Sequence, residues 1–301
     1  MKTILVTGGT GLIGSHLAPA LKKQGWKTHL LSTSGKHTDG WDAVFRWDPE
    51  KDYIDFSSLT DVTHVIHLAG AGIADKRWTD ERKKLIIDSR VKSAAVLLNA
   101  FKSQNHHLEA FVSSSAVGWY GAINDPLLHH EIEPAANDFL GETCRHWEAA
   151  ADRFSEVANR IVKVRTGIVL AKESGALPEM SKPFKFFVGS PLGSGKQQIP
   201  WIHIDDICRI YLEALNDINW KGPINATATE QCTNREFSKA LAKVMHRPLL
   251  PLTVPSFVLK GMLGELSDAI LKGSRISNEK LKGLGFEFKF TELELALRNL
   301  M

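Results

Sequence analysis

The sequence predicts an α/β fold in which a parallel sheet is covered by helices on both faces. Two observations support this prediction. Short apolar, β-branched runs alternate with helical patterns through the first half of the chain, and a glycine-rich turn joins the first run to the first helix. Parallel strands need crossover helices, and these helices bury both faces of the sheet. The pattern is typical of a Rossmann-type doubly wound parallel sheet.

The elements of the first half follow one another in a regular order. In the first helix, Leu17, Ala18 and Leu21 share one face, and Gly25 stops the helix. Further along, Leu85, Ile86, Val91, Ala95 and Leu98 recur at helical spacing. The expected strands are 2–7, 28–32, 62–68, 109–113 and 161–166, and the expected helices are 12–23, 79–102 and 138–159.

The second half of the chain has a different texture. Residues 175–195 are rich in Gly, Pro, Lys and Phe without a clean period. A strand is expected at 199–204 and helices at 205–216, 234–244, 255–271 and 277–284. The fold class therefore includes a smaller C-terminal α+β domain beside the doubly wound sheet.

Composition excludes several classes of protein. The chain has 301 residues, 43% of them hydrophobic and 24% charged, which is typical of a globular protein. The net charge is +3, with 37 Lys and Arg against 34 Asp and Glu, so neither nucleic acid nor a membrane is expected as a partner. No apolar run approaches the roughly 18 residues that span a bilayer. Cys144, Cys208 and Cys232 are too few and too scattered for a disulfide framework or a metal site. We therefore expect a soluble, cytoplasmic protein with reduced thiols and no metal.

The glycine-rich turn predicts a dinucleotide site. Gly8, Gly11 and Gly14 are spaced as G-x-x-G-x-x-G between a strand and a helix. Glycine permits positive φ, lets the backbone approach a diphosphate, and lets the helix pack close to the sheet. The first amides of the helix then face the phosphates. The residues expected to contact the diphosphate are Gly8, Thr10, Gly11, Leu12, Ile13 and Gly14.

The end of the second strand favours NADP(H) over NAD(H). An acidic residue there would bind the ribose 2′-hydroxyl of NAD, but this chain has Ser32, Thr33 and Ser34, followed by Lys36 and His37. Hydroxyl groups and cations suit a 2′-phosphate, which a carboxylate would repel. The alternative is a plain polar loop with no part in specificity.

At this point the sequence resembles the extended branch of the short-chain dehydrogenase/reductase superfamily. The resemblance rests on residues 7–14, 67–70, 111–115 and 201–206. A closer resemblance is to an atypical, NAD(P)-dependent epimerase/dehydratase-like subfamily with a short C-terminal domain of unknown function and an unsettled substrate. Its typical stretches match residues 77–79, 89–91, 118–121, 139–142 with 147–148, 183–203, 233–237 and 285–288.

The resemblance assigns further residues and a domain division. It implies that Leu68, Ala69 and Gly70 lie beside the adenine ribose, and that Ser113 ends the strand carrying the active-site serine. Residues 165–169, with Arg165, Gly167 and Ile168 among the cofactor contacts, would border the nicotinamide. We expect an NAD(P)-binding domain at 1–170, to which 199–226 returns, and a mostly substrate-side domain at 171–301.

The catalytic pair of the superfamily is absent from this chain. Most members use a tyrosine with a lysine one helical turn later, spaced Y-x-x-x-K. The chain has three tyrosines, and none has a lysine four residues later. The natural register places Leu140 and Cys144 at the two positions. Alcohol oxidation by the usual route is therefore not expected.

Other polar residues are candidates for the chemistry. Ser114 or Ser115 could hold a carbonyl oxygen, or bond the backbone or the cofactor ribose. Tyr120 could donate a proton, or be a packed aromatic residue. Arg90 could stabilise an oxyanion or bind an acidic substrate, or form a salt bridge on a buried helix. Cys144 is a reactive thiol or an inert packed residue.

A basic run offers a hint about the substrate. Lys76, Arg77, Arg82, Lys83 and Lys84 surround Trp78. They could attract a phosphorylated or acidic small molecule, although a solvated helix face is the simpler interpretation.

Two functions remain open from the sequence. The first is an NADP-dependent oxidoreductase or nucleoside-diphosphate-sugar-epimerase-like enzyme, which passes a hydride to or from a carbonyl or hydroxyl group of a small molecule. The second is a non-catalytic protein that senses NADP(H) or serves as a scaffold. By analogy with the fold, a homodimer could form through helices 79–102 and 138–159.

Overall fold

The core of the molecule is an eight-stranded sheet. The computed structural model describes residues 2–124 and 126–301. The strand order is β12-β8-β6-β5-β1-β2-β3-β4, and every neighbouring pair is parallel except β3 with β4. The strands are β1 (Thr3–Thr7), β2 (Lys27–Ser32), β3 (Ala43–Asp48), β4 (Tyr53–Ile54), β5 (Val62–His67), β6 (Ala110–Ala116), β8 (Ile161–Thr166) and β12 (Gly222–Ala226). The predicted doubly wound fold is confirmed.

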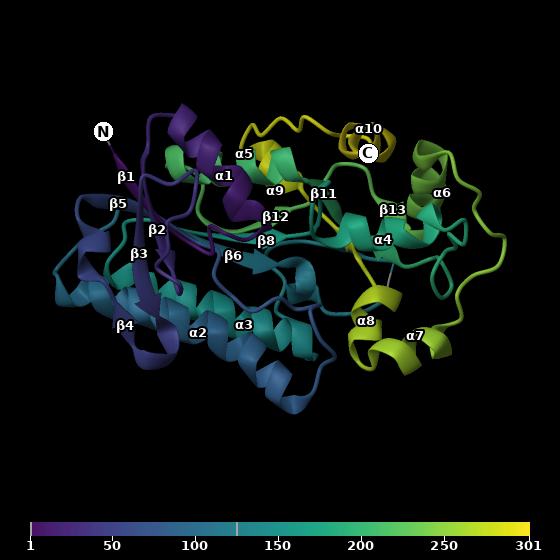
Figure 1. The fold of residues 1–301 in the computed structure, drawn as a ribbon, viewed down its shortest axis with the longest axis horizontal. Coiled ribbons are helices and arrows are strands. Elements are labelled where there is room, and N and C mark those ends of the chain that lie inside the picture. Colours follow the sequence, from purple (N-terminus) through teal and green to yellow (C-terminus); the bar gives the residue numbers. More distant parts are fainter. Residues whose placement is uncertain (1, 125) are drawn as a thin grey trace.

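Helices cover both faces of this sheet (Figure 1). Helices α1 (Leu12–Lys23) and α5 (Ile204–Asn216) pack on one face, and α2 (Asp80–Ser103) and α3 (Phe139–Asp152) pack on the other. Each helix buries one stripe of apolar residues. In α1 the stripe is Gly14, Leu17, Ala18 and Leu21, as its spacing predicts.

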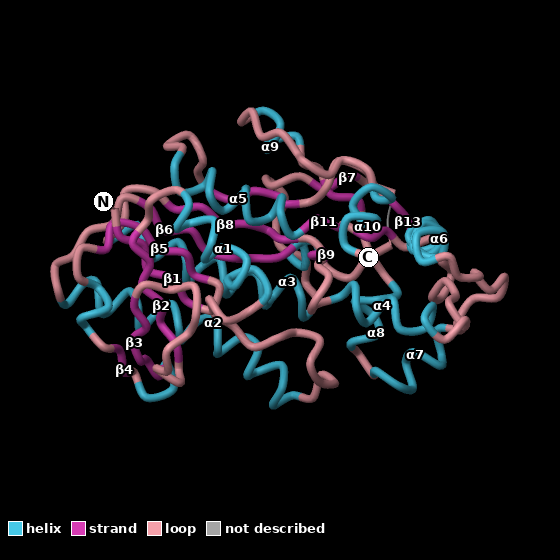
Figure 2. Tube along the Cα trace, turned by 45° about the horizontal axis from the view of Figure 1, so that its top comes forward, coloured by secondary structure: helices cyan, strands magenta, loops and turns pink. Residues whose placement is uncertain are grey.

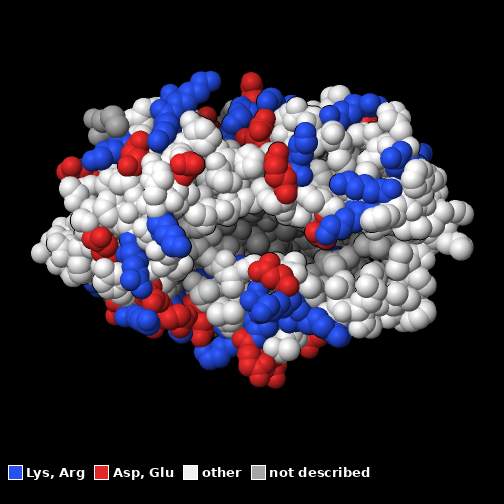
Figure 3. Space-filling model, viewed as in Figure 1, with Lys and Arg blue, Asp and Glu red and all other residues white. Residues whose placement is uncertain are grey.

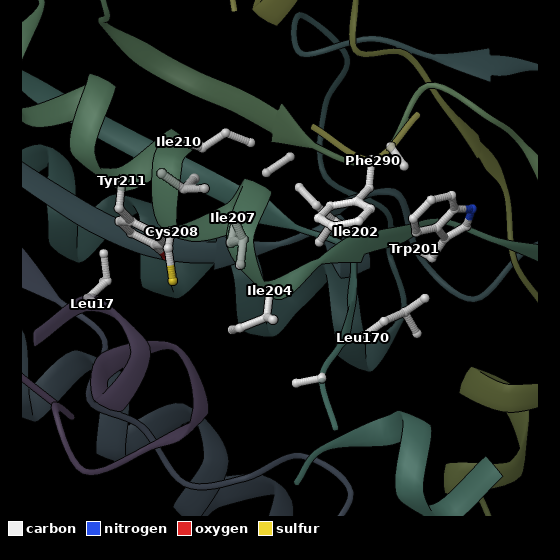
Figure 4. Close-up of a cluster of buried hydrophobic side chains, with 14 of the residues drawn as sticks. Leu17, Leu170, Trp201, Ile202, Ile204, Ile207, Cys208, Ile210, Tyr211 and Phe290 are labelled. Carbon is white, nitrogen blue, oxygen red and sulfur yellow. The ribbon is translucent and has the colours of Figure 1, made fainter. Parts of the chain in front are cut away.

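Figure 4 shows the larger of the two apolar clusters, between the sheet and α5. Ile207, Cys208 and Tyr211 of α5 lie toward Leu17 of α1, while Trp201 continues the cluster toward the C-terminal part. The cluster is therefore continuous from the N-terminal half of the chain to the C-terminal half. This continuity fixes the two halves against each other.

The C-terminal part consists of short helices and small sheets. It is built from α4 (Ala176–Lys185), α6 (Asn234–Met245), α7 (Ser256–Leu263), α8 (Leu266–Leu271), α9 (Glu279–Gly283) and α10 (Leu293–Leu300). Two-stranded sheets are formed by β9 (Ile168–Leu170) with β11 (Trp201–His203), β10 (Gln198–Ile199) with β13 (Cys232–Thr233), and β7 (Leu128–His129) with β14 (Arg275–Ile276). Helix α10 lies beside α6 at the end of the chain (Figure 2). The domain boundary at residue 170 stays a prediction, although β12 does pair with β8 in the main sheet.

Several expected elements differ in the structure. The helix expected at 255–271 is two helices, because Gly264 takes a φ of +62° between them. The strand expected at 199–204 is divided by Pro200, which has no amide hydrogen for a ladder. The helix expected at 138–159 ends at Asp152 and continues as one 3-10 turn. The elements that the sequence did not indicate are β3, β4, β7, β9, β12, β13, β14, α4 and α10.

A hollow crosses the middle of the face shown in Figure 3. In the matching view of Figure 1, it lies between α1 and α4 on one side and the N-terminal half of α2 on the other. The carboxyl ends of the parallel strands open toward it, which is where ligands bind in open parallel sheets. Within residues 2–124 and 126–301, no helix is long and apolar enough to cross a membrane.

Candidate functional site

The glycine-rich turn is shaped by close backbone approaches. Gly8 has a φ of +68°, and a Cβ there would lie 2.8 Å from the carbonyl carbon of Leu68. A Cβ on Gly14 would lie 2.4 Å from the Cα of Gly9. Gly11 is the N-cap of α1, and neither a capping side chain nor an acidic residue occupies the first turn. The open amides at this helix start can therefore bind an anion, as a diphosphate site requires.

A chain of hydrogen bonds holds this turn against β5. Ser93 Oγ donates its hydrogen to the Arg90 carbonyl at 3.0 Å, so the ring hydrogen of neutral His67 is placed on Nε2, which donates to Ser93 Oγ at 3.2 Å. His67 Nδ1 then accepts from Thr7 Oγ1, 2.8 Å away, and Thr7 Oγ1 itself accepts from the Ala69 amide at 3.2 Å. Burial lowers the pKa of His67 to about 4, so the ring is neutral at pH 7. The chain thus fixes one tautomer and links β1, β5 and α2.

The end of β2 gains a cation from β3. Ser32 pairs in register with Arg46, and a Cβ on Gly35 would lie 2.9 Å from the Cβ of Arg46. Ser32 and Ser34 hydroxyls are 3.0 Å apart on the exposed side of this turn. Arg46 is exposed here, and no ion pair engages it within the described part of the chain. The predicted loop 32–34 therefore lies next to an available guanidinium that the sequence pattern did not reveal.

The loop after β5 is fixed by side chains of α2. The Ala71 amide donates to Ser89 Oγ, while Arg90 Nη1 donates to the Ala71 carbonyl at 3.1 Å. Arg82 donates to the Gly72 carbonyl. These hydrogen bonds hold Leu68, Ala69 and Gly70 beside the glycine turn. Within the stretch 89–91, Ser89 and Arg90 therefore position the loop after β5.

Arg90 is a buried cation without a counter-ion. Its residue is 8% exposed, its guanidinium carbon lies 4.5 Å from the centre of the Trp147 ring, and Nε has no hydrogen-bond acceptor. Among the described residues no carboxylate pairs with it, so the salt bridge considered from the sequence is not formed. Burial lowers the pKa of Arg90 to about 10, which leaves it charged at neutral pH. The side chain packs against Gly70, since a Cβ there would lie 3.2 Å from its guanidinium carbon.

Arg165 and Ser115 share one buried carboxylate. Glu148 of α3 accepts from Arg165 Nε at 2.7 Å and from Ser115 Oγ at 2.8 Å, and all three residues are buried. Arg165 also stacks on Trp119, with 3.8 Å between the guanidinium carbon and the ring centre. Arg165 and Glu148 thus neutralise each other's buried charge. Sequence reasoning placed Arg165 at the nicotinamide and gave no role to Glu148.

Tyr120 belongs to the same buried network. Its hydroxyl donates to Asn225 Oδ1 at 2.7 Å and accepts from Arg165 Nη1 at 3.0 Å. Burial raises the pKa of Tyr120 to about 12. Because Asn225 and Arg165 already occupy this hydroxyl, we do not expect Tyr120 to donate a proton to a substrate.

The other two serines differ in their hydrogen bonding. Ser113 donates to the Ser114 carbonyl at 3.0 Å. Ser114 is 8% exposed, and the nearby Tyr211 hydroxyl of α5 is buried without a hydrogen-bond partner among the described residues. Burial raises the pKa of Tyr211 to about 12. The three serines thus lie at the carboxyl end of β6 as expected, and the hydroxyl groups of Ser113 and Ser115 donate to protein acceptors.

Leu140 and Cys144, which the sequence register assigns to the two positions of the usual pair, lie next to Gly118, just beyond β6. Leu140 Cβ and Cys144 Sγ are the atoms nearest to a Cβ built on Gly118, at 3.3 and 3.6 Å. Burial raises the pKa of Cys144 to about 12, which keeps the thiol protonated. Neither side chain supplies a proton donor or a base at neutral pH.

Gly167 and Ile168 lie at the carboxyl end of β8. A Cβ on Gly167 would lie 2.2 Å from the Pro200 carbonyl oxygen, so only glycine fits. Ile168 begins β9, which the chain leaves toward α4. At the N-cap of α4, a Cβ on Gly175 would lie 2.8 Å from the Leu12 side chain of α1. This segment therefore borders the glycine turn from the C-terminal side.

The basic run at 76–84 is largely neutralised. Lys84 pairs with Asp88, Lys83 with Glu265, and Arg82 with Asp75. Arg77 donates to the Gly261 carbonyl at 3.3 Å. Arg77 and Lys83 connect this segment to α7 and to the start of α8, while Lys76, Arg77 and Lys84 are exposed to solvent.

Comparison with known proteins decides the family. A model described as the NAD dependent epimerase/dehydratase family matches residues 4–150, and a domain of unknown function (DUF1731) matches residues 254–300. An epimerase family protein of Staphylococcus haemolyticus is 37% identical over 311 aligned residues, covering 100% of this chain and 99% of that protein. The chain belongs to the NAD-dependent epimerase/dehydratase family. The resemblance drawn from the sequence is confirmed.

Solved structures agree with this assignment. The human epimerase family protein SDR39U1, solved with NADPH, has a TM-score of 0.85 and 29% identity, covering 99% of this chain and 98% of that one. UDP-glucose 4-epimerase of Thermus thermophilus, solved with NAD, has a TM-score of 0.77 at 21% identity, covering 98% and 96%. The second likeness shows the shared fold alone.

The neutral, buried His67 makes stability depend on pH. The unfolded chain binds a proton at this residue near pH 6.5, whereas the folded chain binds it only near pH 4. The free energy of unfolding should therefore fall as the pH is lowered through this window, with up to about 3 kcal/mol from His67. Urea unfolding at pH 7, 5.5 and 4.5 should show a shallower pH dependence for His67→Asn than for the native chain. The exposed His37→Asn serves as control, and equal slopes for His67→Asn and the native chain would contradict the neutral ring.

Proposed function

We propose that this family member binds NADP(H) and reduces a carbonyl group of a small anionic molecule. Arg90 carries the proposal, because this buried cation has an unpaired Nε and no counter-ion among the described residues, and it packs directly against Gly70 beside the glycine turn. Such a charge is costly to bury unless an anion completes it. Two sources of negative charge fit: an acidic group of the substrate, and the oxygen that becomes negative during carbonyl reduction.

The residues present fit a bound NADP(H). The open amides of Leu12, Ile13 and Gly14 would hold the diphosphate, and Ser32, Ser34 and Arg46 would surround the 2′-phosphate. Bound NADPH would supply the hydride. The chain's own residues then orient the acceptor and hold negative charge at its oxygen.

The polar groups favour reduction over oxidation. Oxidation needs a base for the hydroxyl proton, and the high pKa values of Cys144 and Tyr120 keep both groups protonated. Reduction needs a cation near the carbonyl oxygen and a proton that water can supply. Arg90 provides the cation without a tyrosine and lysine pair.

A second candidate is a protein that binds NADP(H) without turnover. It is favoured by Leu140 and Cys144, which leave the end of β6 without a proton donor. Under this candidate Arg90 would serve the cofactor alone. Transfer of hydride to a small molecule separates the two.

The diphosphate site is tested most cleanly at Gly11. Its φ is −78°, and a Cβ there would meet only the Gly8 carbonyl oxygen at 3.2 Å, so a side chain is tolerated with a small shift. In Gly11→Asp a carboxylate would face the phosphates, whereas Gly11→Asn has nearly the same shape without the charge. Calorimetric titration with NADPH should show at least a roughly hundredfold weaker Kd for the aspartate variant and a smaller loss for asparagine. Equal Kd values for the two variants would argue against an anion at this position.

Arg46 should set the preference for NADP(H). Removing one charge-assisted contact to a phosphate costs roughly 1.5–3 kcal/mol, or about a tenfold to hundredfold change in Kd. Arg46→Ala should weaken NADPH binding by this factor and leave NADH binding within about twofold, as measured by fluorescence titration. Lys27→Ala, at the opposite end of β2, is the control. A parallel loss for both cofactors would place Arg46 outside the 2′-phosphate site.

Arg90→Met separates a functional from a structural role. Methionine fills similar space and removes the buried charge, so the free energy of unfolding should stay equal or rise by about 1–2 kcal/mol. Hydride transfer or anion binding should fall, and Arg90→Lys should recover part of either. Urea unfolding and NADPH oxidation measure the two effects. A loss of more than about 2 kcal/mol in Arg90→Met would show that Arg90 is mainly structural.

A further inference from the structure

Two segments of the C-terminal part contain no acidic residue. Residues 180–204 and 237–264 together hold seven Lys and Arg and no Asp or Glu, although the whole chain has 37 basic and 34 acidic residues. The remaining chain is therefore acidic overall, with 30 basic against 34 acidic residues. Although the net charge of the whole chain is only +3, these two segments are basic and the rest of the chain is slightly acidic.

The two segments lie side by side in the fold. The Leu250 amide donates to the Gly189 carbonyl at 2.8 Å, and the Val254 amide donates to the Pro191 carbonyl at 2.9 Å. Figures 1 and 2 both place the loop between α6 and α7, together with α7 itself, at the same end of the molecule. On the face shown in Figure 3 this end is mostly uncharged, with Lys and Arg along its margin.

These segments also expose a large share of the apolar side chains. They hold eight of the seventeen exposed large hydrophobic residues in the described chain. Phe186 is 76% exposed, Phe257 75% and Met262 67%. We call this set the apolar surface; its members are Phe186, Phe187, Val188, Leu250, Leu252, Phe257, Val258 and Met262.

Helix α7 shows that this exposure is systematic. Phe257, Val258 and Met262 fall within one outward arc of the helix, while Leu259 points inward and is buried. The helix is thus apolar on both its inner and its outer face. An outward apolar arc on a short surface helix is typical of an interaction surface.

Among the described residues, three cations that pair with no carboxylate lie beside the apolar surface. Lys185 adjoins Phe186 in the chain, Lys260 lies on α7, and Arg247 lies 4.6 Å from the centre of the Phe187 ring. None of the three pairs with a carboxylate in residues 2–124 and 126–301. Long basic side chains next to exposed aromatic residues suit the boundary between lipid headgroups and acyl chains.

We propose that the apolar surface docks on an anionic phospholipid bilayer. Apolar side chains would enter the boundary region while Lys185, Arg247 and Lys260 meet lipid phosphates. A second copy of this chain fits less well, because a symmetric contact through the same surface would bring these cations together. The whole-chain charge predicted no membrane partner, and the distribution of the charge revises that expectation. The proposal stands independently of the cofactor and of catalysis.

Flotation of the full-length protein with vesicles tests the proposal. Vesicles of phosphatidylcholine mixed with an equal part of phosphatidylglycerol are compared with phosphatidylcholine alone. Binding to the anionic vesicles should be at least tenfold stronger and should weaken as salt is raised. Absence of binding to either vesicle, or equal binding to both, would overturn the proposal.

Two double variants test the two components separately. Phe186→Ser with Phe257→Ser removes apolar contacts, and Arg247→Glu with Lys260→Glu reverses charge. Each should lower binding at least tenfold while the thermal unfolding midpoint and NADPH binding stay unchanged. The control is Ile132→Ser with Ile218→Ser, at residues 95% and 74% exposed outside the apolar surface, and it should bind like the native chain.

Sedimentation velocity tests the alternative that a second copy of the chain binds to the apolar surface. If the native chain dimerises and the Phe186→Ser, Phe257→Ser variant does not, the surface joins two copies and the bilayer proposal is wrong. Vesicle binding that survives in both double variants would contradict it equally.

Discussion

The site depends on one close approach, that of the glycine turn to the end of β5. Gly8 has no Cβ, and the backbone of Leu68 lies where that atom would be. The hydrogen bonds from Thr7 to His67 and from His67 to Ser93 stabilise this close packing of the glycine turn on β5. In this arrangement the His67 imidazole is neutral. Because Ser93 also bonds the Arg90 carbonyl, the contacts that hold the proposed diphosphate site also position Arg90, the residue to which we assign a role in the proposed reaction. Cofactor binding and Arg90 are thus linked through local packing.

Arg165 and Arg90, the two buried arginines near the carboxyl ends of the strands, differ in how their charge is balanced. Arg165 is matched by Glu148 and supported by Ser115, Tyr120 and Trp119, so its charge is complete within the protein. Arg90 has only carbonyl oxygens and an aromatic face. A protein retains an incomplete buried charge at some cost in stability, and such sites are commonly functional. This contrast is the physical reason for assigning support to one arginine and chemistry to the other.

Much of the fold could be predicted from local pattern, and much of the site could not. The first helix begins and ends where its periodicity and the stop at Gly25 predict, at Leu12 and Lys23. Strand β3 was missed because it is largely only half-buried, with Trp47 its one fully buried residue, and Arg46 was missed with it. Arg165 and Tyr120 have the residue types of a catalytic site, yet their roles depend on Glu148 and Asn225, which come from distant parts of the chain. The lack of a carboxylate beside Arg90 is a property of three-dimensional packing that no spacing can show.

The fate of a labelled hydride tests the central claim most directly. The protein would be incubated with NADPH carrying deuterium at the transferable position, together with a panel of small carbonyl compounds that bear a carboxylate or phosphate. We predict that deuterium passes from the cofactor to a carbon of at least one anionic carbonyl compound, and that Arg90→Met slows this transfer at unchanged stability. If NADPH binds tightly but its deuterium is never transferred to any member of the panel or of a metabolite extract, the protein is a binder of NADP(H) and the catalytic account is contradicted.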